Sequence, residues 1–280
     1  FAYCLESEDI QNLPPFMREK DRASSLVSKT HGLLDICGTK LSNGNNKQYE
    51  PLKTINYLVA GKADCDNDKD EEKKEEFDSS QDDEKTKGGS SIDDSYSFRW
   101  ETLTEMTEPR FFPGVCEFAN GSKLCVIGGD RGMKKGYSDA VEIFDYQKKQ
   151  WIMGKKMNQN SGRRSAGCCY WKERNCIVVG GGYDGQYSKK VEMYDLVKNK
   201  WSKCPDTTLG HAGGPNVTIR YDWIHNGMIT VGGILSGAWQ DHIEFIDLRE
   251  AKAKWVVLCD IAEKAGYKKS TLNFTQRRLL

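Results

Sequence analysis

The feature that most constrains this chain of 280 residues is an internal repeat with a period close to 50. Each unit begins with a basic or polar residue, which is followed by an apolar run that ends in two glycines. A run of acidic and apolar residues that ends in Asp comes next, and a Trp follows it. The glycine-ending runs are CVIGG, IVVGG and ITVGG, and the later runs are VEIFD, VEMYD and IEFID. Their first glycines are Gly128, Gly180 and Gly232, so both intervals are 52 residues. Such a period indicates an architecture of stacked repeats.

Each unit is predicted to form four short strands. Residues 141–145 and 191–195 alternate with the period of two that is typical of strands. Asn-Gly pairs lie between the first two apolar runs of two units, at 120–121 and 226–227, which indicates tight hairpin turns. No helical pattern of about 10–15 residues separates the runs, which excludes parallel β-α-β packing. A four-stranded unit with two apolar faces must stack on neighbours, and radial stacking into a propeller achieves this.

A fourth, degenerate unit is predicted upstream of the three clear ones. Trp100 lies about one period before the first tryptophan of the clear units. Arg22 precedes Arg110 by 88 residues, and removal of the 34-residue acidic segment 62–95 leaves 54. In this alignment the acidic segment precedes the last strand of the unit. In a rival alignment, the run at 57–61 is the strand that ends in glycine.

The order of Arg, Gly-Gly, aromatic-Asp and Trp at this period resembles the kelch repeat. The resemblance is strong in 110–155, 163–205 and 211–259 and weak in 22–106. In the kelch family each repeat is one blade of a β-propeller. The resemblance therefore implies an all-β fold: a kelch-type β-propeller, incomplete, with about four blades of which one is degenerate. The third clear unit departs from the pattern, because it has His211 where the others have Arg.

We divide the chain at these repeats. A ring of four blades would be an unusual closure for the family, and the start at Phe1 rather than Met favours a fragment. The expected parts are the end of a preceding blade or a linker at 1–21, a degenerate blade at 22–109 with a disordered acidic insertion at 62–95, kelch blades at 110–162, 163–210 and 211–260, and a tail or the start of the next blade at 261–280.

The motif glycines and tryptophans are structural in the kelch family. Glycine pairs adopt positive φ and let a neighbouring backbone approach. Each tryptophan provides a large apolar area between blades. The residues expected in this structural role are Gly128, Gly129, Trp151, Gly180, Gly181, Trp201, Gly232, Gly233 and Trp255.

Charge is divided unevenly along the chain. The formal net charge is zero, but residues 62–95 contain 14 Asp and Glu against 6 Lys, so the remainder is net +8. Carboxylates from Asp64 to Glu75 have the spacing of an EF-hand loop, but Lys69 occupies the position that requires glycine. We therefore expect a disordered, solvated segment rather than a calcium site. Such a segment could contact the basic body or a basic partner, with strong salt dependence.

The ten cysteines include no CxxC pair and no Cys/His cluster with zinc-ligand spacing. Several lie in apolar runs, such as Cys125 in KLCVIGG and Cys176 in RNCIVVGG. Because free cysteine behaves as a small buried hydrophobe, we expect reduced core thiols and a cytoplasmic protein. Three Asn-x-Ser/Thr sequons nominally favour secretion, but such short motifs arise by chance. No run of about 18 apolar residues occurs, so we expect no contact with a membrane.

The sequence contains no motif of a catalytic or cofactor site. Among His31, His211, His225 and His242, no two lie three or four residues apart. A nucleophile elbow and a phosphate-binding loop are absent, and the glycine-rich string at 180–185 ends a strand. Basic pairs lack the aromatic interleaving that binds nucleic acid. We expect no catalytic residues, no metal, no cofactor and no nucleic-acid partner.

Function in a propeller is carried by loops that rigid blades position. The connections after the glycine pairs, at 130–140, 182–190 and 234–242, contain Tyr, Trp and Arg, which are enriched at interface hot spots. The residues predicted to bind a protein partner are Arg131, Tyr137, Tyr183, Tyr187 and Trp239 in these connections, and Arg163 and His211 between blades.

The predicted function is that of a non-catalytic protein-protein interaction module. The kelch resemblance implies, as one hypothesis, the substrate-recognition part of a ubiquitin ligase adaptor. One alternative, also from the resemblance, is an actin or cytoskeletal scaffold. Another is an enzyme with a metal or substrate site at the propeller axis.

Overall fold

The computed structural model describes residues 21–41, 49–62, 96–132, 135–158, 162–210, 218–222, 227–235, 238–239, 242–247, 249–250 and 252–260. Several expectations lie outside these residues. They concern the ends of the chain at 1–20 and 261–280, His211, and the acidic stretch from residue 63 to residue 95.

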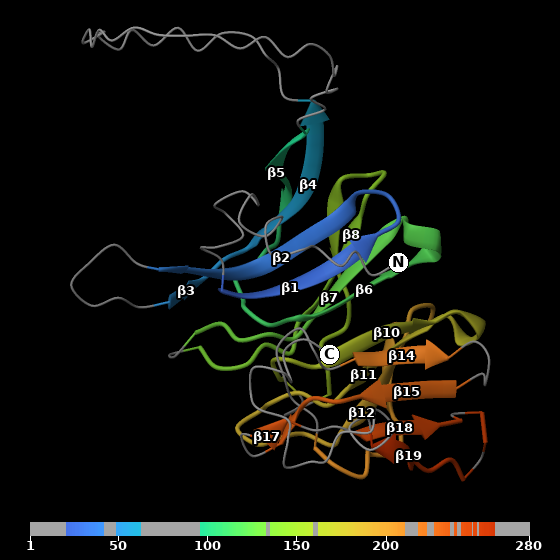
Figure 1. The fold of residues 1–280 in the computed structure, drawn as a ribbon. Helices are drawn as coiled ribbons and strands as arrows, with labels where there is room; N and C mark the ends of the chain where they lie inside the picture. Colours follow the sequence, from blue (N-terminus) through green and yellow to red (C-terminus); the bar gives the residue numbers. More distant parts are fainter. Residues whose placement is uncertain are drawn as a thin grey trace, which may run out of the picture.

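The described residues form four larger antiparallel sheets, each of which is one blade, and one two-stranded sheet (Figure 1). The second blade consists of β6 (Gly114–Phe118), β7 (Lys123–Ile127), β8 (Val141–Asp145) and β9 (Gln150–Met153). The third consists of β10 (Gly167–Trp171), β11 (Cys176–Gly180), β12 (Val191–Asp195) and β13 (Lys200–Lys203). The fourth consists of β14 (Thr218–Asp222), β15 (Gly227–Val231), β18 (His242–Ile246) and β19 (Val256–Asp260).

The first blade has longer strands than the others. It contains β1 (Asp21–Ser28), β2 (Gly32–Leu41), β4 (Thr54–Lys62) and β5 (Tyr96–Glu105), in that order, and β3 (Tyr49–Pro51) pairs with β2. The run at 57–61 lies in β4, the third strand, so it does not occupy the place of the glycine-ending second strand. Trp100 lies in the last strand, β5.

Two short 3₁₀ turns and one small hairpin complete the described elements. The turns are η1 (Ala119–Gly121) and η2 (Lys172–Arg174), which join the first two strands of the second and third blades. Asn120 and Gly121 have positive φ in η1, so this Asn-Gly pair forms a turn as predicted. The hairpin pairs β16 (Ile234–Leu235) with β17 (Ala238–Trp239).

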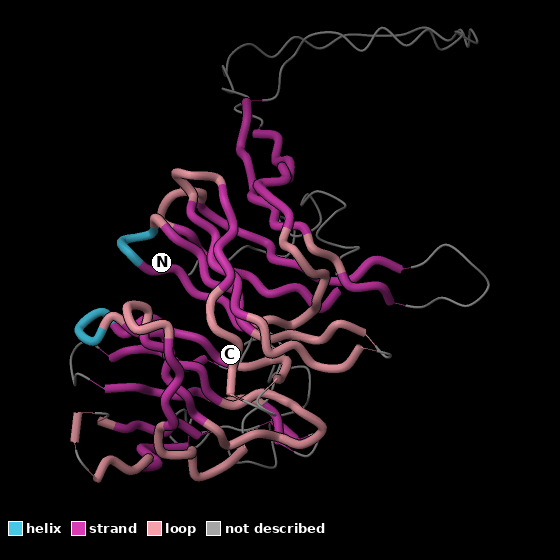
Figure 2. Tube along the Cα trace, turned by 180° about the vertical axis from the view of Figure 1, so that it is seen from behind, coloured by secondary structure: helices cyan, strands magenta, loops and turns pink. Residues whose placement is uncertain are grey.

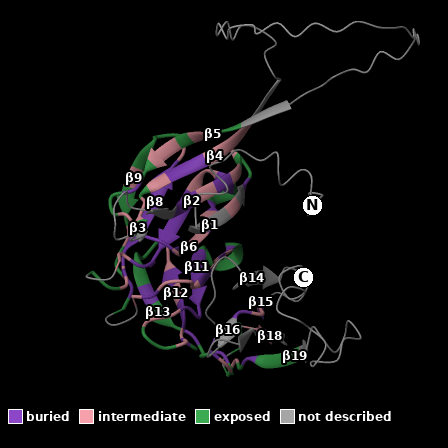
Figure 3. Ribbon diagram, turned by 60° about the vertical axis from the view of Figure 1, so that its left-hand side comes forward, coloured by how far each residue is buried: buried purple, intermediate pink, exposed green. Residues whose placement is uncertain are grey.

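The blades follow one another around a common axis. Their first strands lie side by side in the order β1, β6, β10 and β14 (Figure 1). The outer strands β9, β13 and β19 carry many exposed side chains, whereas β8 and β11 are buried (Figure 3). Among the described residues, the fold is all-β and is that of an incomplete kelch-type β-propeller.

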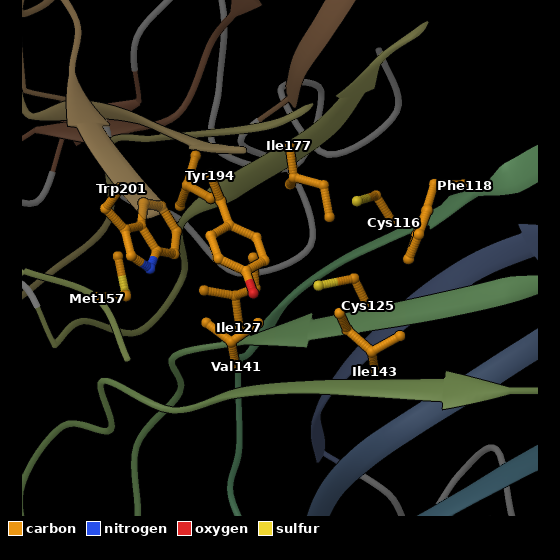
Figure 4. Close-up of a cluster of buried hydrophobic side chains, with 11 residues drawn as sticks. Cys116, Phe118, Cys125, Ile127, Val141, Ile143, Met157, Ile177, Tyr194 and Trp201 are labelled. Atoms are coloured by element: carbon orange, nitrogen blue, oxygen red, sulfur yellow. The ribbon is translucent and has the colours of Figure 1, made fainter. Parts of the chain in front are cut away.

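The core lies between blades because each strand buries both faces. Leu124 and Val126 of β7 pack toward the first blade, while Cys125 and Ile127 of the same strand pack toward the third. Figure 4 shows the cluster between the second and third blades, which Trp201 closes at one end. A third cluster joins the third blade to the fourth. This explains the apolar runs of five residues, because the period of two separates two buried faces.

The cysteines of the described residues contribute to these clusters. Seven of the cysteines in the described residues are free thiols, and all seven but Cys168 are buried. Burial raises the pKa of Cys176 to about 12 and that of Cys204 to about 11. These thiols are therefore protonated core residues, as predicted. In the described part of the chain, no helix has the length and apolar character needed to cross a membrane.

Candidate functional site

Neighbouring strands are antiparallel, so the connections fall on two opposite rims of the propeller. One rim carries the short turns between the first and second and between the third and fourth strands, and both 3₁₀ turns lie on this side (Figure 2). We call this the turn rim: the described residues of 29–31, 119–122, 145–150, 172–175, 195–200 and 247–255. The loop rim carries the other connections: the described residues of 50–53, 105–113, 128–140, 154–166, 181–190, 203–210 and 232–239.

Glycine pairs turn the chain at the loop rim. Gly128 has φ of 65°, and a Cβ on it would lie 2.4 Å from the carbonyl oxygen of Arg163, so only glycine fits. In the third and fourth blades the pairs with this geometry start at Gly181 (φ 66°) and Gly232 (φ 63°). The pair in the third blade was expected to start at Gly180. That was one residue too early, because Gly180 ends β11 within a run of three glycines.

Buried ion pairs stabilise the loops of the loop rim. Arg163 Nη1 donates to Glu192 Oε2 at 2.7 Å, and both side chains are buried. Arg110 makes the same pair with Glu142 in the second blade and also donates to the carbonyl oxygen of Gly128 at 3.0 Å. The prediction that Arg163 binds a partner is therefore wrong. Its side chain is 1% exposed, and the guanidinium compensates a buried carboxylate.

The motif tryptophans tie each blade to the one before it. Trp201 Nε1 donates to the carbonyl oxygen of Lys155 at 2.8 Å, and Trp255 Nε1 donates to that of Pro205 at 2.9 Å. Trp151 donates to a threonine hydroxyl of the first blade at 3.1 Å. These bonds fix neighbouring blades relative to each other, and so they fix the loops that the blades carry.

At the junction of the second and third blades, Arg164 lies among aromatic rings on the loop rim. Its Nη1 forms an ion pair with Asp130 Oδ2 at 3.1 Å. Its guanidinium carbon lies 5.3 Å from the ring centre of Tyr183, 5.9 Å from that of Tyr137 and 6.0 Å from that of Phe112. These distances are within the range of cation–π attraction.

The tyrosines of the two blades touch one another. The ring of Tyr183 meets that of Tyr137 edge-on at 6.0 Å and that of Tyr187 at 5.3 Å. Tyr183 also forms isolated β-bridges with Tyr187 and with Arg164. All three tyrosines are half-buried, and burial raises the pKa of Tyr137. We call the set the aromatic cluster: Phe112, Asp130, Tyr137, Arg164, Tyr183 and Tyr187.

The remaining predicted residues lie elsewhere. Arg131 braces its own loop, because its Nη2 donates to the carbonyl oxygen of Lys135 at 2.6 Å. Trp239 lies in β17, on the connection that follows the glycine pair of the fourth blade. The structure therefore brings three of the predicted residues, Tyr137, Tyr183 and Tyr187, into one cluster.

Comparison with known proteins agrees with this geometry. The sequence model of the Kelch motif matches residues 174–208, which span β11, β12 and β13. The chain therefore contains a kelch motif. It is 29% identical over 133 residues to Kelch-like protein 34 of Homo sapiens, covering 43% of this chain and 20% of that protein. It is 29% identical over 121 residues to Kelch-like protein 36 of Rattus norvegicus, covering 41% of this chain and 19% of that protein. The chain thus spans about a fifth of the length of these relatives.

Sequence reasoning missed three members of the aromatic cluster: Phe112, Asp130 and Arg164. The sequence offers two neighbouring arginines, 163 and 164, for the place of the motif arginine, and the structure puts Arg163 there. The spacing contained the signal, because Arg110 precedes Gly128 by 18 residues and Arg163 precedes Gly181 by the same number. In that alignment Arg163 is the motif arginine, and Arg164, the next residue, lies at the surface.

The aromatic cluster offers binding groups. It has three phenol hydroxyls, half-buried ring faces and a guanidinium. No group of three His, Cys, Asp or Glu that could hold a metal is present in the part of the chain that the structure describes. Rings and an ion pair that are fixed in place suit recognition of another surface.

Proposed function

We propose that this kelch protein is a non-catalytic protein-recognition module whose aromatic cluster binds the partner. The observation that carries the proposal is the place of Arg164, which is ion-paired to Asp130 and surrounded by half-buried rings at the junction of two blades. Tyr and Arg are the residue types that dominate binding energy at protein interfaces.

Pre-organisation supports the proposal. The rings contact one another and the guanidinium before a partner arrives, so little side-chain entropy remains to be lost on binding. The buried pairs beneath, such as Arg163 with Glu192, hold the loops that carry the rings. A partner would therefore meet a surface that is already in its binding geometry.

The finer proposal follows the kelch resemblance. We propose that the chain is the substrate-recognition part of a ubiquitin ligase adaptor and acts in the cytoplasm, with a cytoskeletal scaffold as the alternative. The similarity to Kelch-like proteins from two mammals supports this finer proposal.

The test is quantitative capture of partner proteins by the wild-type chain and by Tyr183→Ala/Tyr187→Ala. The double variant should lose most of the captured proteins, because truncation of hot-spot residues at an interface costs at least tenfold in affinity. Its thermal unfolding should remain cooperative, which separates loss of binding from loss of fold.

Two matched variants sharpen this test. Tyr183→Phe/Tyr187→Phe keeps the rings and should retain most of the capture, and Lys148→Ala/Lys149→Ala changes the turn rim and should retain all of it. If the alanine variant captures the same proteins as the wild type in the same amounts, the aromatic cluster is not the binding surface.

A further inference from the structure

The turn rim is built by the motif aspartates. Asp145 Oδ1 accepts hydrogen bonds from the backbone N–H groups of Gln147 and Lys148, both at 3.1 Å. Asp195 accepts the equivalent bonds in the third blade, from residues 197 and 198 at 3.0 and 2.8 Å. The exposed residues that follow these two bends include Lys148, Lys149, Lys198 and Lys200.

Exposed charge on this rim is strongly positive. Among its described residues, only Glu173 and Glu250 are exposed acidic side chains. Two of the basic residues form ion pairs with a motif aspartate, Lys198 with Asp195 and an arginine with Asp247. The exposed basic residues number ten and come from all four blades: Lys29, Lys148, Lys149, Lys172, Arg174, Lys198, Lys200, Arg249, Lys252 and Lys254.

On the side of this rim, β4 and β5 of the first blade extend as a two-stranded ribbon away from the other blades (Figure 1). Leu34 of β2, three residues beyond the turn at 29–31, pairs with Tyr57 of β4. Beyond Tyr57, β4 pairs only with β5, as far as the pair of Lys62 with Tyr96 (Figure 1). Five residues of strand extend about 17 Å. The chain therefore leaves and re-enters the described structure on the turn-rim side.

The segment that starts and ends at the tip of this ribbon is the acidic one. Residues 63–95 contain 14 Asp and Glu against 5 Lys, a net charge of −9. With both ends held at the ribbon, 33 residues can reach at most about 55 Å. A tethered segment has an effective concentration on the order of millimolar, far above that of a free acidic partner.

We propose that the turn rim is a docking surface for the chain's own acidic segment, residues 63–95. The charges are opposite, because the rim exposes ten basic and two acidic side chains and the segment has a net charge of −9. The segment is tethered where it can reach that surface. This docking is independent of the aromatic cluster, which lies on the opposite rim. A free acidic protein that approaches the turn rim must displace the segment first.

The test uses zero-length carbodiimide coupling of carboxylates to lysines in the full chain, with the links identified by mass spectrometry. At about 20 mM salt, residues 63–95 should couple to the turn-rim lysines Lys148, Lys149, Lys198, Lys200 and Lys252. At about 1 M salt, where the screening length falls to about 3 Å, these links should decrease at least tenfold. Lys135, Lys155 and Lys189 of the loop rim are the exposed controls and should couple rarely.

A variant and an isotope mixture complete the test. Lys148→Gln/Lys149→Gln should reduce coupling to the remaining turn-rim lysines, whereas Lys155→Gln/Lys156→Gln should leave it unchanged. In a mixture of ¹⁴N- and ¹⁵N-labelled chains, the links should join segments of the same chain. Equal coupling to both rims, coupling that salt does not change, or links that join different chains would overturn the proposal.

Discussion

The loop rim and the turn rim are built from the same repeats, yet they differ in the charge of their exposed side chains. Among the described residues, the loop rim exposes six basic and four acidic side chains, and the turn rim exposes ten and two. On the loop rim, the buried Arg163 is paired with Glu192 and the half-buried Arg164 with Asp130. The motif residues build both rims. The residues between the motif positions make one rim aromatic and the other basic.

The largest effect is expected where the loop rim depends on a buried charge. Arg163→Leu leaves Glu192 buried without its cation, so the free energy of unfolding should fall by about 3–5 kcal/mol in urea titration. Adding Glu192→Leu removes the uncompensated charge and should restore most of the loss. Lys198→Ala, which breaks an exposed pair on the turn rim, should leave the unfolding midpoint unchanged. Equal losses from Arg163→Leu and Lys198→Ala would remove the difference between the rims.

The glycine pairs provide the next test. Gly128→Ala combines a left-handed φ with a clash against a backbone carbonyl, and should cost about 3 kcal/mol of unfolding free energy. Gly136, in the same loop, has the same φ of 65° with nothing within 4 Å of its Cβ. Its alanine variant should therefore lose only the strain, about 1–2 kcal/mol. Identical urea midpoints for the two variants would show that close packing at the loop rim is unimportant.

A smaller effect is expected from the bonds between blades. Trp201→Phe keeps an aromatic ring in the core but removes the donor to Lys155, and should lower the free energy of unfolding by about 1 kcal/mol. Thermal unfolding measures this as a shift of a few degrees. A variant as stable as the wild type would mean that this hydrogen bond does not help to hold the third blade against the second.

The smallest effect concerns the turn rim and depends on pH. The hydrogen bond from Arg249 lowers the pKa of Asp247 to about 2, below its ordinary value of 3.8. The stability that Asp247 contributes is therefore fully present above pH 4 to 5 and is lost as pH falls through 2. Asp247→Ala should lower the urea midpoint at pH 7, and its difference from the wild type should be largely lost at pH 2, where about half of the folded molecules have this carboxyl protonated. A difference that persists unchanged at pH 2 would refute this role of the ionised carboxylate.

Much of the fold could be predicted from the sequence because its periodic signals are local. The spacing of glycines, Asp and Trp predicted four-stranded blades, and the Asn-Gly pair at 120–121 predicted a turn. The site was harder to predict. Arg163 and Arg164 are chemically identical neighbours, and only the packing of the third blade decides which is buried with Glu192 and which meets Asp130. Tyrosines in loops could be found by residue type, but their mutual contacts could not.

The most direct test of the central claim is hydrogen exchange of the kelch chain, alone and with a partner obtained by capture. If the aromatic cluster binds the partner, amides in 130–132, 135–140 and 181–190 should exchange more slowly in the complex, while those of the turns at 145–150 and 195–200 should be unchanged. Protection confined to the turn rim, with the loop rim unaffected, would contradict the account.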